Sequence, residues 1–258
     1  MKSIAVILLT ILVMASCEDE GSGSDSSSFE KEPSLYQEFD FEDNGKGYGW
    51  HDEWARATWT QNHTQMTVDR AMPEDGKLHI MTTDYLQAEP DYAGDLTALG
   101  GSVQTKNRYL YGKWEARLKP SSESGVVNAF FLWNDVNYQE VDIEFTPYTF
   151  GKNTGEVHLA IHAEGRSNHF VSDVKVDFNP SDDFHVYTIE VYTDRVVWRV
   201  DGDLLDEYEY DDVVKIDTEC MALLNGWSST SEWVKGPPAQ TAHYFIDWVK
   251  FFPCTSGN

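Results

Sequence analysis

Residues 138–145 read Tyr-Gln-Glu-Val-Asp-Ile-Glu-Phe, and acidic and apolar side chains alternate through the last six of them. Successive side chains of a β-strand point to opposite faces, so Glu140, Asp142 and Glu144 share one face of an extended segment. The three apolar residues that alternate with them form the other face. The stretch therefore predicts a strand that packs on a core with one face and presents three carboxyl groups with the other.

Similar alternation recurs along most of the chain, between segments rich in turn-forming residues. No window of about a dozen residues shows the 3.6-residue period of an amphipathic helix, and Asp201-Gly202 is a strong hairpin signal. We therefore predict one all-β, antiparallel domain, a β-sandwich or jelly roll, with Trp198 and Trp248 in its core. The clearest predicted strands are 77–83, 112–119, 127–133, 156–162, 186–192 and 195–201.

The acidic triplet points to a particular chemistry. Three carboxyl groups on one strand face repel one another, which raises the pKa of at least one of them. Glycoside hydrolysis needs that arrangement, because one ionised carboxylate acts as nucleophile while a second, protonated carboxyl gives its proton to the leaving oxygen. The triplet alone also fits a solvated strand edge or a calcium site built from carboxylate oxygens.

The strand predicted next places His158, Ala160 and His162 on one face. If this strand pairs with the acidic one, the imidazoles can hydrogen-bond the acids or sugar hydroxyls, and the small Ala160 leaves room for a ligand. Two ordinary half-exposed histidines are the alternative. A catalytic zinc centre is disfavoured, because an alternating strand does not present a compact ligand cluster with an open position.

Tryptophans supply candidate sugar-stacking surfaces in this polar chain. Trp133 ends an apolar run just before the acids. Trp227 and Trp233 lie in a Gly/Ser-rich segment that begins at Asn225 and is predicted to be a loop, which cannot easily bury both rings. Each of these rings is as well suited to packing as to stacking on a sugar.

Charge limits the class of partner. The formal net charge is −25, of which residues 1–35 contribute −4 and the remainder −21. This sign argues against nucleic acid and anionic membrane surfaces, and more weakly against sulfated or uronic-acid polymers, so a neutral polysaccharide is the expected partner. Besides Cys17, the chain contains Cys220 and Cys254, which can pair or remain as two buried thiols.

The first residues have the pattern of a targeting signal. Lys2 precedes an apolar run at residues 4–15, which is too short to span a bilayer as a mature helix. The run ends at Met14-Ala-Ser-Cys17, which resembles a bacterial lipobox, and residues 18–34 are acidic and then Gly/Ser-rich, as in a flexible tether. An ordinary secretory signal with an incidental cysteine is the alternative.

We therefore expect a lipoprotein signal peptide at residues 1–16, a lipidated Cys17 with its tether at 17–35, and the catalytic β-jelly-roll domain at 36–258. The acidic run after the cysteine resembles the surface-export signal of some bacterial lipoproteins. The expected location is the bacterial envelope, at the outer-membrane surface or in the periplasm, with the lipid anchor as the only membrane contact.

With these residues in view, the chain resembles glycoside hydrolase family 16, in its branch of lichenases and xyloglucan-active enzymes. Glu140-Val-Asp-Ile-Glu144 is similar to the Glu-x-Asp-x-Glu form of the family motif. The resemblance implies a concanavalin A-like jelly roll with a concave carbohydrate-binding cleft and a retaining mechanism. Glu140 would be the nucleophile, Glu144 the general acid/base and Asp142 the residue that tunes their charges. Further similar blocks are 104–112, 125–131, 179–187, 198–202 and 245–250.

The resemblance also implies that the reaction needs no cofactor. It places a structural calcium at Asp247, with the carbonyl oxygen of Gly76 as a partner. Gln104 stands where lichenases carry an arginine and is closer to the xyloglucan-active enzymes. Other lichenase-like cleft positions fall on Ser102, Ala160, His162, Ala222 and Leu224, so the substrate is less well defined than the catalysis.

These observations predict a retaining, endo-acting glycoside hydrolase that cleaves a neutral β-glucan, with mixed-linkage β-1,3-1,4-glucan first and xyloglucan second. Besides the catalytic triplet, the predicted substrate-binding residues are Trp133, His158, His162, Gln104, Asn225, Trp227 and Trp233. Alternatives are a laminarin- or galactan-active hydrolase or transglycosylase of the same family, a non-catalytic glycan-binding lipoprotein, and a calcium-dependent adhesin.

Overall fold

The computed structural model describes residues 37–40, 54–89, 91, 94–163 and 167–254. The predicted signal peptide at 1–16 and the tether with Cys17 at 17–35 lie outside these ranges, so both stay predictions. No helix within the described ranges is long and apolar enough to cross a membrane.

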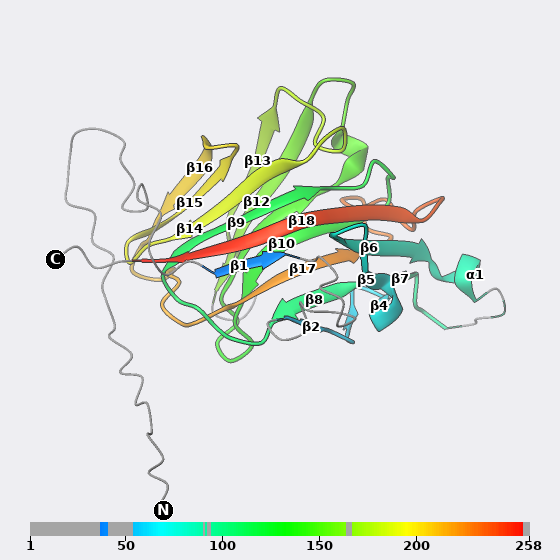
Figure 1. Ribbon diagram of the computed structural model, residues 1–258, viewed down its shortest axis with the longest axis horizontal. Coiled ribbons are helices and arrows are strands. Elements are labelled where there is room, and N and C mark those ends of the chain that lie inside the picture. Colours follow the sequence, from blue (N-terminus) through cyan, green and yellow to red (C-terminus); the bar gives the residue numbers. More distant parts are fainter. Residues whose placement is uncertain (1–36, 41–53, 90, 92–93, 164–166, 255–258) are drawn as a thin grey trace, which may run out of the picture.

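Two large β-sheets face each other across a shared core (Figure 1). The larger sheet has eleven strands in the order β16-β15-β14-β9-β18-β6-β7-β4-β3, with β1 beside β18 and β5 beside β6. Its strands are β1 (Gln37–Asp40), β3 (Thr60–Gln61), β4 (Thr64–Met66), β5 (Ala71–Glu74), β6 (Lys77–Asp84), β7 (Ala98–Gly100), β9 (Gly112–Lys119), β14 (His185–Val191), β15 (Arg195–Val200), β16 (Asp203–Glu209) and β18 (Ala242–Pro253).

The smaller sheet has seven strands in the order β13-β12-β11-β10-β17-β8-β2. They are β2 (Trp54–Arg56), β8 (Ser102–Thr105), β10 (Val127–Trp133), β11 (Glu140–Phe145), β12 (Gly155–Ala163), β13 (Ser167–Val176) and β17 (Met221–Trp227). The described helical elements are short: α1 (Tyr85–Ala88) and the 3₁₀ turns η2 (Val68–Arg70) and η3 (Pro147–Thr149). The predicted all-β sandwich is confirmed, and each of the six predicted strands is present.

The core between the sheets fixes which face of β11 carries the acids. Val141, Ile143 and Phe145 are fully buried in the main apolar cluster, which also contains the predicted core residue Trp198. Each fully buried side chain of this kind stabilises the fold by roughly 1.5–3 kcal/mol relative to an exposed one. A one-residue slip of β11 would expose all three and bury the acids, so the register is strongly specified.

The core prediction for Trp248 is wrong. In β18, Tyr244 and Ile246 are fully buried, but the next fully buried residue is Val249, because the pairing with β9 shifts between Ile246 and Trp248. A bulge adds one residue to a strand and reverses the side-chain alternation beyond it. Trp248 is therefore half-buried on the outward face, where the Lys250 ammonium lies 4.5 Å from its ring centroid.

The Asp201-Gly202 hairpin is confirmed between β15 and β16. The backbone φ angles are 51° at Asp201 and 89° at Gly202, the left-handed values that a two-residue type I′ turn requires. Aspartate and glycine tolerate this conformation better than most residues, so the turn chemistry and the strand pattern agree.

Cys220 is a free, buried thiol, so it does not pair with Cys254. Its Sγ donates to the carbonyl oxygen of Thr218 at 3.3 Å. Burial is the main cause that raises the pKa of the Cys220 thiol to about 12. A buried thiol in this state is unreactive and acts as a small apolar side chain.

Candidate active site

Strand pairing brings the acidic and imidazole side chains together on the face of the smaller sheet that points away from the core, which we call the site face. β11 lies between β10 and β12, with Trp133 of β10 directly opposite Glu140. The predicted pairing of the histidine strand with the acidic strand is therefore present. The cross-strand pairs between β11 and β12 are Glu140–His162, Asp142–Ala160 and Glu144–His158.

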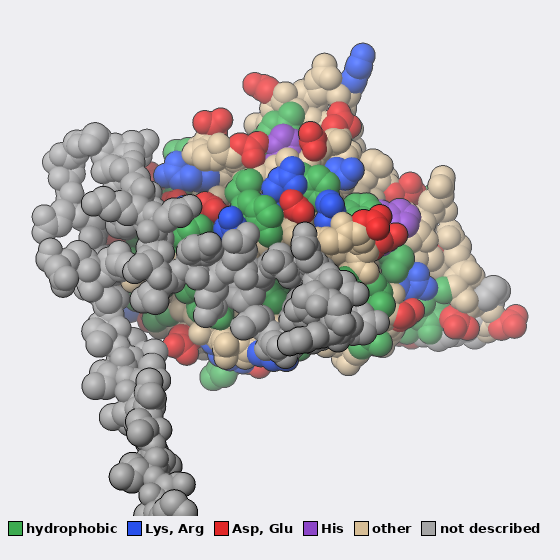
Figure 2. All heavy atoms as spheres, in the orientation of Figure 1, with side chains coloured by type: hydrophobic (Ala, Val, Ile, Leu, Met, Phe, Trp, Pro, Cys, Tyr) green, Lys and Arg blue, Asp and Glu red, His purple; other side chains and the backbone are tan. Residues whose placement is uncertain are grey.

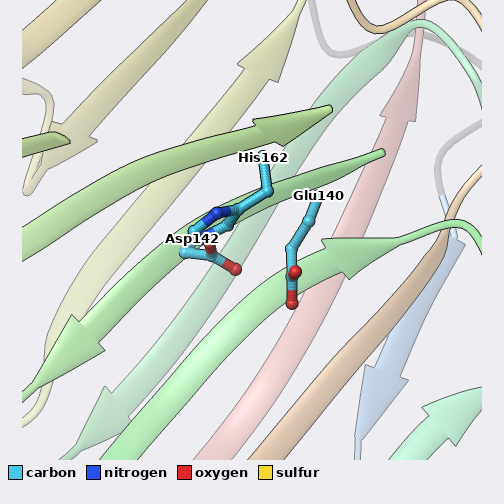
Figure 3. Close-up of side chains that lie close together, drawn as sticks. All are labelled: Glu140, Asp142 and His162. Carbon is cyan, nitrogen blue, oxygen red and sulfur yellow. Dashed lines mark ion pairs between the residues drawn. The ribbon is translucent and has the colours of Figure 1, made fainter. Parts of the chain in front are cut away.

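Asp142 is the most buried of the three carboxyl groups, at 4% exposure. Its Oδ2 lies 3.2 Å from Nε2 of His162 (Figure 3). Burial, and then the negative charge of Glu144, raises the pKa of Asp142 well above its ordinary value. A protonated Asp142 adds no negative charge between the two glutamates and can donate a hydrogen bond to one of them.

Glu144 has the properties of a general acid. Burial raises its pKa to about 7, and the negative charge of Glu140 acts in the same direction. The charges of His158 and His162 oppose this rise. The Trp227 indole N–H also lowers the Glu144 pKa, as a hydrogen-bond donor to the carboxylate. A carboxyl group with this pKa keeps its proton at weakly acidic pH and is about half protonated at neutral pH.

A pocket of about 590 Å³ opens beside Glu140. Three amides and four aromatic rings contribute to its lining, which suits hydrogen bonds to hydroxyl groups and stacking on sugar faces. The amides are Gln61, Asn62 and Gln104, and the rings are Trp59, Phe131, Trp133 and Tyr138. Of these, sequence reasoning identified Trp133 and Gln104.

Some of the pocket residues that sequence reasoning missed were easier to predict from the sequence than others. Tyr138 precedes the nucleophile candidate Glu140 by two positions, and its neighbours are turn-forming, so its place next to the acids was a usable signal. Trp59 directly precedes β3 and Asn62 lies in the turn after it, far earlier in the chain. No local pattern connects that turn with the acidic strand.

The loop between β10 and β11 holds Tyr138 in a fixed position. The side-chain carbonyl of Gln139 accepts hydrogen bonds from the backbone N–H groups of Asp217 and Thr218, both at 3.1 Å. Tyr138 itself has φ 60°, an uncommon left-handed value for a residue with a Cβ. Its ring centroid lies 5.9 Å from that of Trp133, so the two rings form one aromatic wall.

The predicted loop from Asn225 to Trp233 is wrong for its first three residues, which belong to β17. Asn225 is fully buried and donates to the side-chain oxygen of Gln61 at 3.1 Å, so it supports the pocket indirectly. Trp227 is 6% exposed and packs in an apolar cluster. Trp233 is half-buried, with its ring 4.9 Å from that of His158, and lies on the Glu144 side of the site.

The lichenase-like cleft positions assigned to Ala222 and Leu224 are also wrong, by one residue. Both side chains are fully buried in the main core between the sheets. Met221 and Leu223 alternate with them and pack with Trp133 on the site face. Because strand faces have a period of two, a one-residue error in alignment exchanges site and core positions.

Glu140, Asp142 and His162 each place one atom of a metal-binding type within 4.8 Å of the others. A metal ion would need a deprotonated Asp142 and an accessible His162 nitrogen. Burial favours the protonated form of Asp142, and its Oδ2 lies against Nε2 of His162. The cluster is therefore better suited to proton chemistry than to metal binding.

The surroundings of the predicted calcium ligands are cationic. Oδ2 of Asp247 accepts a hydrogen bond from Nη1 of Arg117 at 2.5 Å, and the Lys77 ammonium donates to the Asp75 carbonyl in the turn that contains Gly76. Figure 2 views the outward side of the larger sheet, where basic, acidic and apolar side chains are interspersed. A calcium ion at Asp247 would have to displace the Arg117 guanidinium, and the Lys77 ammonium adds positive charge beside Gly76, so the ion does not fit here.

We therefore expect the melting temperature of the protein to be the same in excess calcium chloride and in EDTA. An ion bound to the native state alone would raise the melting temperature with its concentration. Differential scanning calorimetry in both buffers is the measurement. A rise with calcium that EDTA reverses would show that the ion binds despite Arg117 and Lys77.

Known proteins share this architecture. The model of the family described as glycosyl hydrolases family 16 matches residues 50–250. A β-glucanase of Bacillus amyloliquefaciens is 28% identical over 265 residues, which cover 97% of this chain and 99% of that protein. A lichenase from a mouse hindgut metagenome superposes with a TM-score of 0.69 at 21% identity, over 85% of this chain and 98% of that one.

An endo-β-1,3-glucanase from Pyrococcus furiosus also superposes with a TM-score of 0.69, at 20% identity over 86% of this chain and 94% of that one. Likenesses at this level of identity establish the jelly-roll fold. The family model goes further, because its match extends over most of both sheets and includes the acidic strand β11. The chain therefore belongs to glycosyl hydrolase family 16.

Proposed function

We propose that the protein is a retaining endo-β-glucanase that hydrolyses a neutral β-glucan, with Glu140 as nucleophile and Glu144 as general acid/base. One observation carries this proposal: Glu140 and Glu144 project from the same face of β11, where burial raises the pKa of Glu144 to about 7 and the charge of Glu140 acts in the same direction. Two carboxyl groups in different protonation states are what double displacement at a sugar carbon requires.

The first displacement forms a bond between a Glu140 carboxylate oxygen and the anomeric carbon. The bond from that carbon to the departing sugar oxygen breaks, and Glu144 gives its proton to this oxygen. In the second displacement, Glu144 takes a proton from water while the water oxygen attacks the same carbon and releases Glu140. Two inversions leave the original configuration.

The two glutamates must lean toward one sugar ring. Residues four apart on a strand have Cα atoms about 13 Å apart, whereas retaining hydrolysis uses carboxyl groups about 5–5.5 Å apart. Both side chains are long enough to approach each other from the same face of β11. Burial favours the protonated form of Asp142 between them, which limits the repulsion of this approach.

The pocket beside Glu140 supports an uncharged substrate. Its amides Gln61, Asn62 and Gln104 bind hydroxyl groups without a formal charge, and Asp135 at its border is paired with Arg108 at 2.7 Å. We propose mixed-linkage β-1,3-1,4-glucan as the first substrate, in line with the lichenase likeness. Xyloglucan is the second, because of Gln104, and laminarin is a further candidate given the Pyrococcus furiosus likeness.

Incubating the purified domain with mixed-linkage glucan, xyloglucan, laminarin and neutral galactans tests the proposal. Rapid loss of viscosity with release of oligosaccharides supports an endo-hydrolase, and products longer than the donor would indicate transglycosylation. Binding to a glycan without any product from the unmutated protein would favour the non-catalytic lipoprotein instead. Binding that a chelator abolishes, without turnover, would favour the calcium-dependent adhesin.

Replacing Tyr138 by alanine is expected to raise KM for the glucan roughly threefold to tenfold with a smaller change in kcat, the range that one lost aromatic stacking contact supports. The reason is that Tyr138 widens the aromatic wall at Trp133 and takes no part in bond breaking. Steady-state kinetics on the best substrate are the measurement. Val136, in the same loop and 79% exposed, provides the control Val136→Ala, which should leave KM unchanged.

We further propose that Cys17 carries the lipid that anchors the domain in the bacterial envelope. The lipobox-like residues before Cys17 and the acidic tether after it support this assignment. Fractionation of cells that produce the full chain tests it. The protein should be in the membrane fraction, and Cys17→Ser should release it, whereas membrane retention of Cys17→Ser would contradict the anchor.

A further inference from the structure

Three neighbouring strands place a carboxyl, an imidazole and a second carboxyl in one row across the site face. Glu144 on β11 is directly opposite His158 on β12, and His158 is directly opposite Asp173 on β13. Neighbouring strands are about 4.8 Å apart, so each member of the row lies within reach of the next. Glu144 is the inner end of the row and Asp173, at 52% side-chain exposure, is the outer end.

The His158 ring is held on two sides. Its Nδ1 lies 2.6 Å from Oδ1 of Asp173, and its ring centroid lies 4.9 Å from that of Trp233. The contact with Asp173 uses one ring nitrogen and so leaves the opposite ring edge, with Nε2, for the site. At 15% side-chain exposure, His158 is only partly screened by solvent from its neighbours.

We propose that His158 is a positioning residue that sets the acidity of the acid/base Glu144, and that Asp173 acts on Glu144 through His158. This inference rests on the proposed function of Glu144. A cationic imidazole beside a carboxyl group favours the carboxylate form and thereby limits the pH up to which the proton is available for the leaving sugar.

The charge of His158 is the largest of the effects that lower the Glu144 pKa, and it opposes the desolvation that raises it. Other titratable groups also face this part of the site from each packed strand. They are Glu140 and Asp142 on β11, Glu156 and His162 on β12, and Asp173 and Lys175 on β13. On the other side of Glu144, β10 contributes the uncharged Ala129. His158 is the group among them that faces Glu144 directly across a strand pair.

The chain contains a matched control for this arrangement on the other sheet. Nδ1 of His185 lies 2.6 Å from Oδ2 of Asp201, with side-chain exposures of 18% and 49% that resemble the 15% and 52% of the first pair. His185 also stacks on an aromatic ring, that of Phe178, at 4.0 Å between centroids. This second pair belongs to β14 and the β15–β16 turn and has no place in the acidic triplet.

The test is the pH dependence of kcat/KM on the best glucan, measured for the unmutated protein and for His158→Gln, Asp173→Ala, the double variant and His185→Gln. His158→Gln should move the basic limb to higher pH by about half a unit to one unit, because Glu144 loses a neighbouring positive charge. Asp173→Ala should move it the same way, since the ring is no longer held opposite Glu144. The double variant should match His158→Gln alone, and His185→Gln should match the unmutated protein.

A basic limb that stays in place in a folded His158→Gln variant would overturn the inference, and so would shifts that add in the double variant. Thermal melting establishes folding, and His158→Asn serves as the second variant if His158→Gln does not fold. The proposed function fails separately, when the unmutated protein releases no product from any glucan. An active enzyme with an unmoved basic limb rejects only the role of His158.

Discussion

Glu140→Ala is expected to lower kcat on the polysaccharide by about four orders of magnitude or more, because no covalent intermediate can form without the nucleophile. Glu140 is half-buried at the edge of the pocket, so its truncation removes little core contact and the fold should persist. Product release from mixed-linkage glucan is the measurement, with thermal melting as the check on folding.

Adding azide to the Glu140→Ala variant provides a more specific test of this prediction. A small anion in the space vacated by the side chain can attack the anomeric carbon while Glu144 protonates the departing sugar oxygen. One displacement then replaces two, so the glycosyl azide should have inverted configuration. The control is Glu156→Ala, which removes a carboxyl group from the face of β12 that carries His158 and should keep wild-type activity. Full activity of Glu140→Ala, or an azide product of retained configuration, would contradict the role of Glu140.

The sequence predicts the face of β11 reliably because burial and alternation agree there. Val141, Ile143 and Phe145 have no polar alternative and must face the core, so the acids must face outward. Pairing with the histidine strand follows from the chain order, since consecutive strands of an antiparallel sheet are usually neighbours. The catalytic candidates therefore come from the local pattern together with one pairing rule, and the structure contains that pairing.

The wrong predictions concern local features of the sequence that are caused by tertiary contacts. Gly226 contributes to the loop-like composition of Asn225–Trp227, yet it lies inside β17. A Cβ on Gly226 would come within 2.5 Å of the Thr82 hydroxyl, so the glycine permits a close approach to β6 rather than a turn. The bulge that turns Trp248 outward has no distinctive residue either. Both features depend on contacts with strands that are distant in the sequence.

The substrate-binding side of the site was harder to predict than its catalytic centre for the same reason. Glu140 and Glu144 are four residues apart, whereas the pocket combines β3, β8, β10 and β17, which are distributed over most of the described chain. Trp59 becomes a pocket residue only because the fold places it and Gln104 around the same pocket. No composition or spacing in either segment encodes that neighbourhood.

Glu144→Ala is expected to lower kcat/KM on the polysaccharide by about 10²- to 10⁴-fold, because the departing sugar oxygen is a poor leaving group unless it is protonated. An aryl glycoside whose phenol leaves without a proton should keep a fast first displacement. The glycosyl-enzyme should then accumulate, because no base activates water. A burst of phenol followed by slow turnover is the expected time course, measured by stopped-flow absorbance.

The pH profile and the nucleophile distinguish this role from a structural one. With the unmutated enzyme, kcat/KM on the glucan should fall as pH rises through about 7, where Glu144 loses its proton. On the activated aryl substrate, Glu144→Ala should lack that basic limb. Azide should attack the accumulated intermediate and give a product of retained configuration, the opposite of the Glu140→Ala result. Equal losses on both substrates would instead mean that Glu144 acts in the architecture of the site, because an acid/base residue must matter most where the leaving group needs its proton.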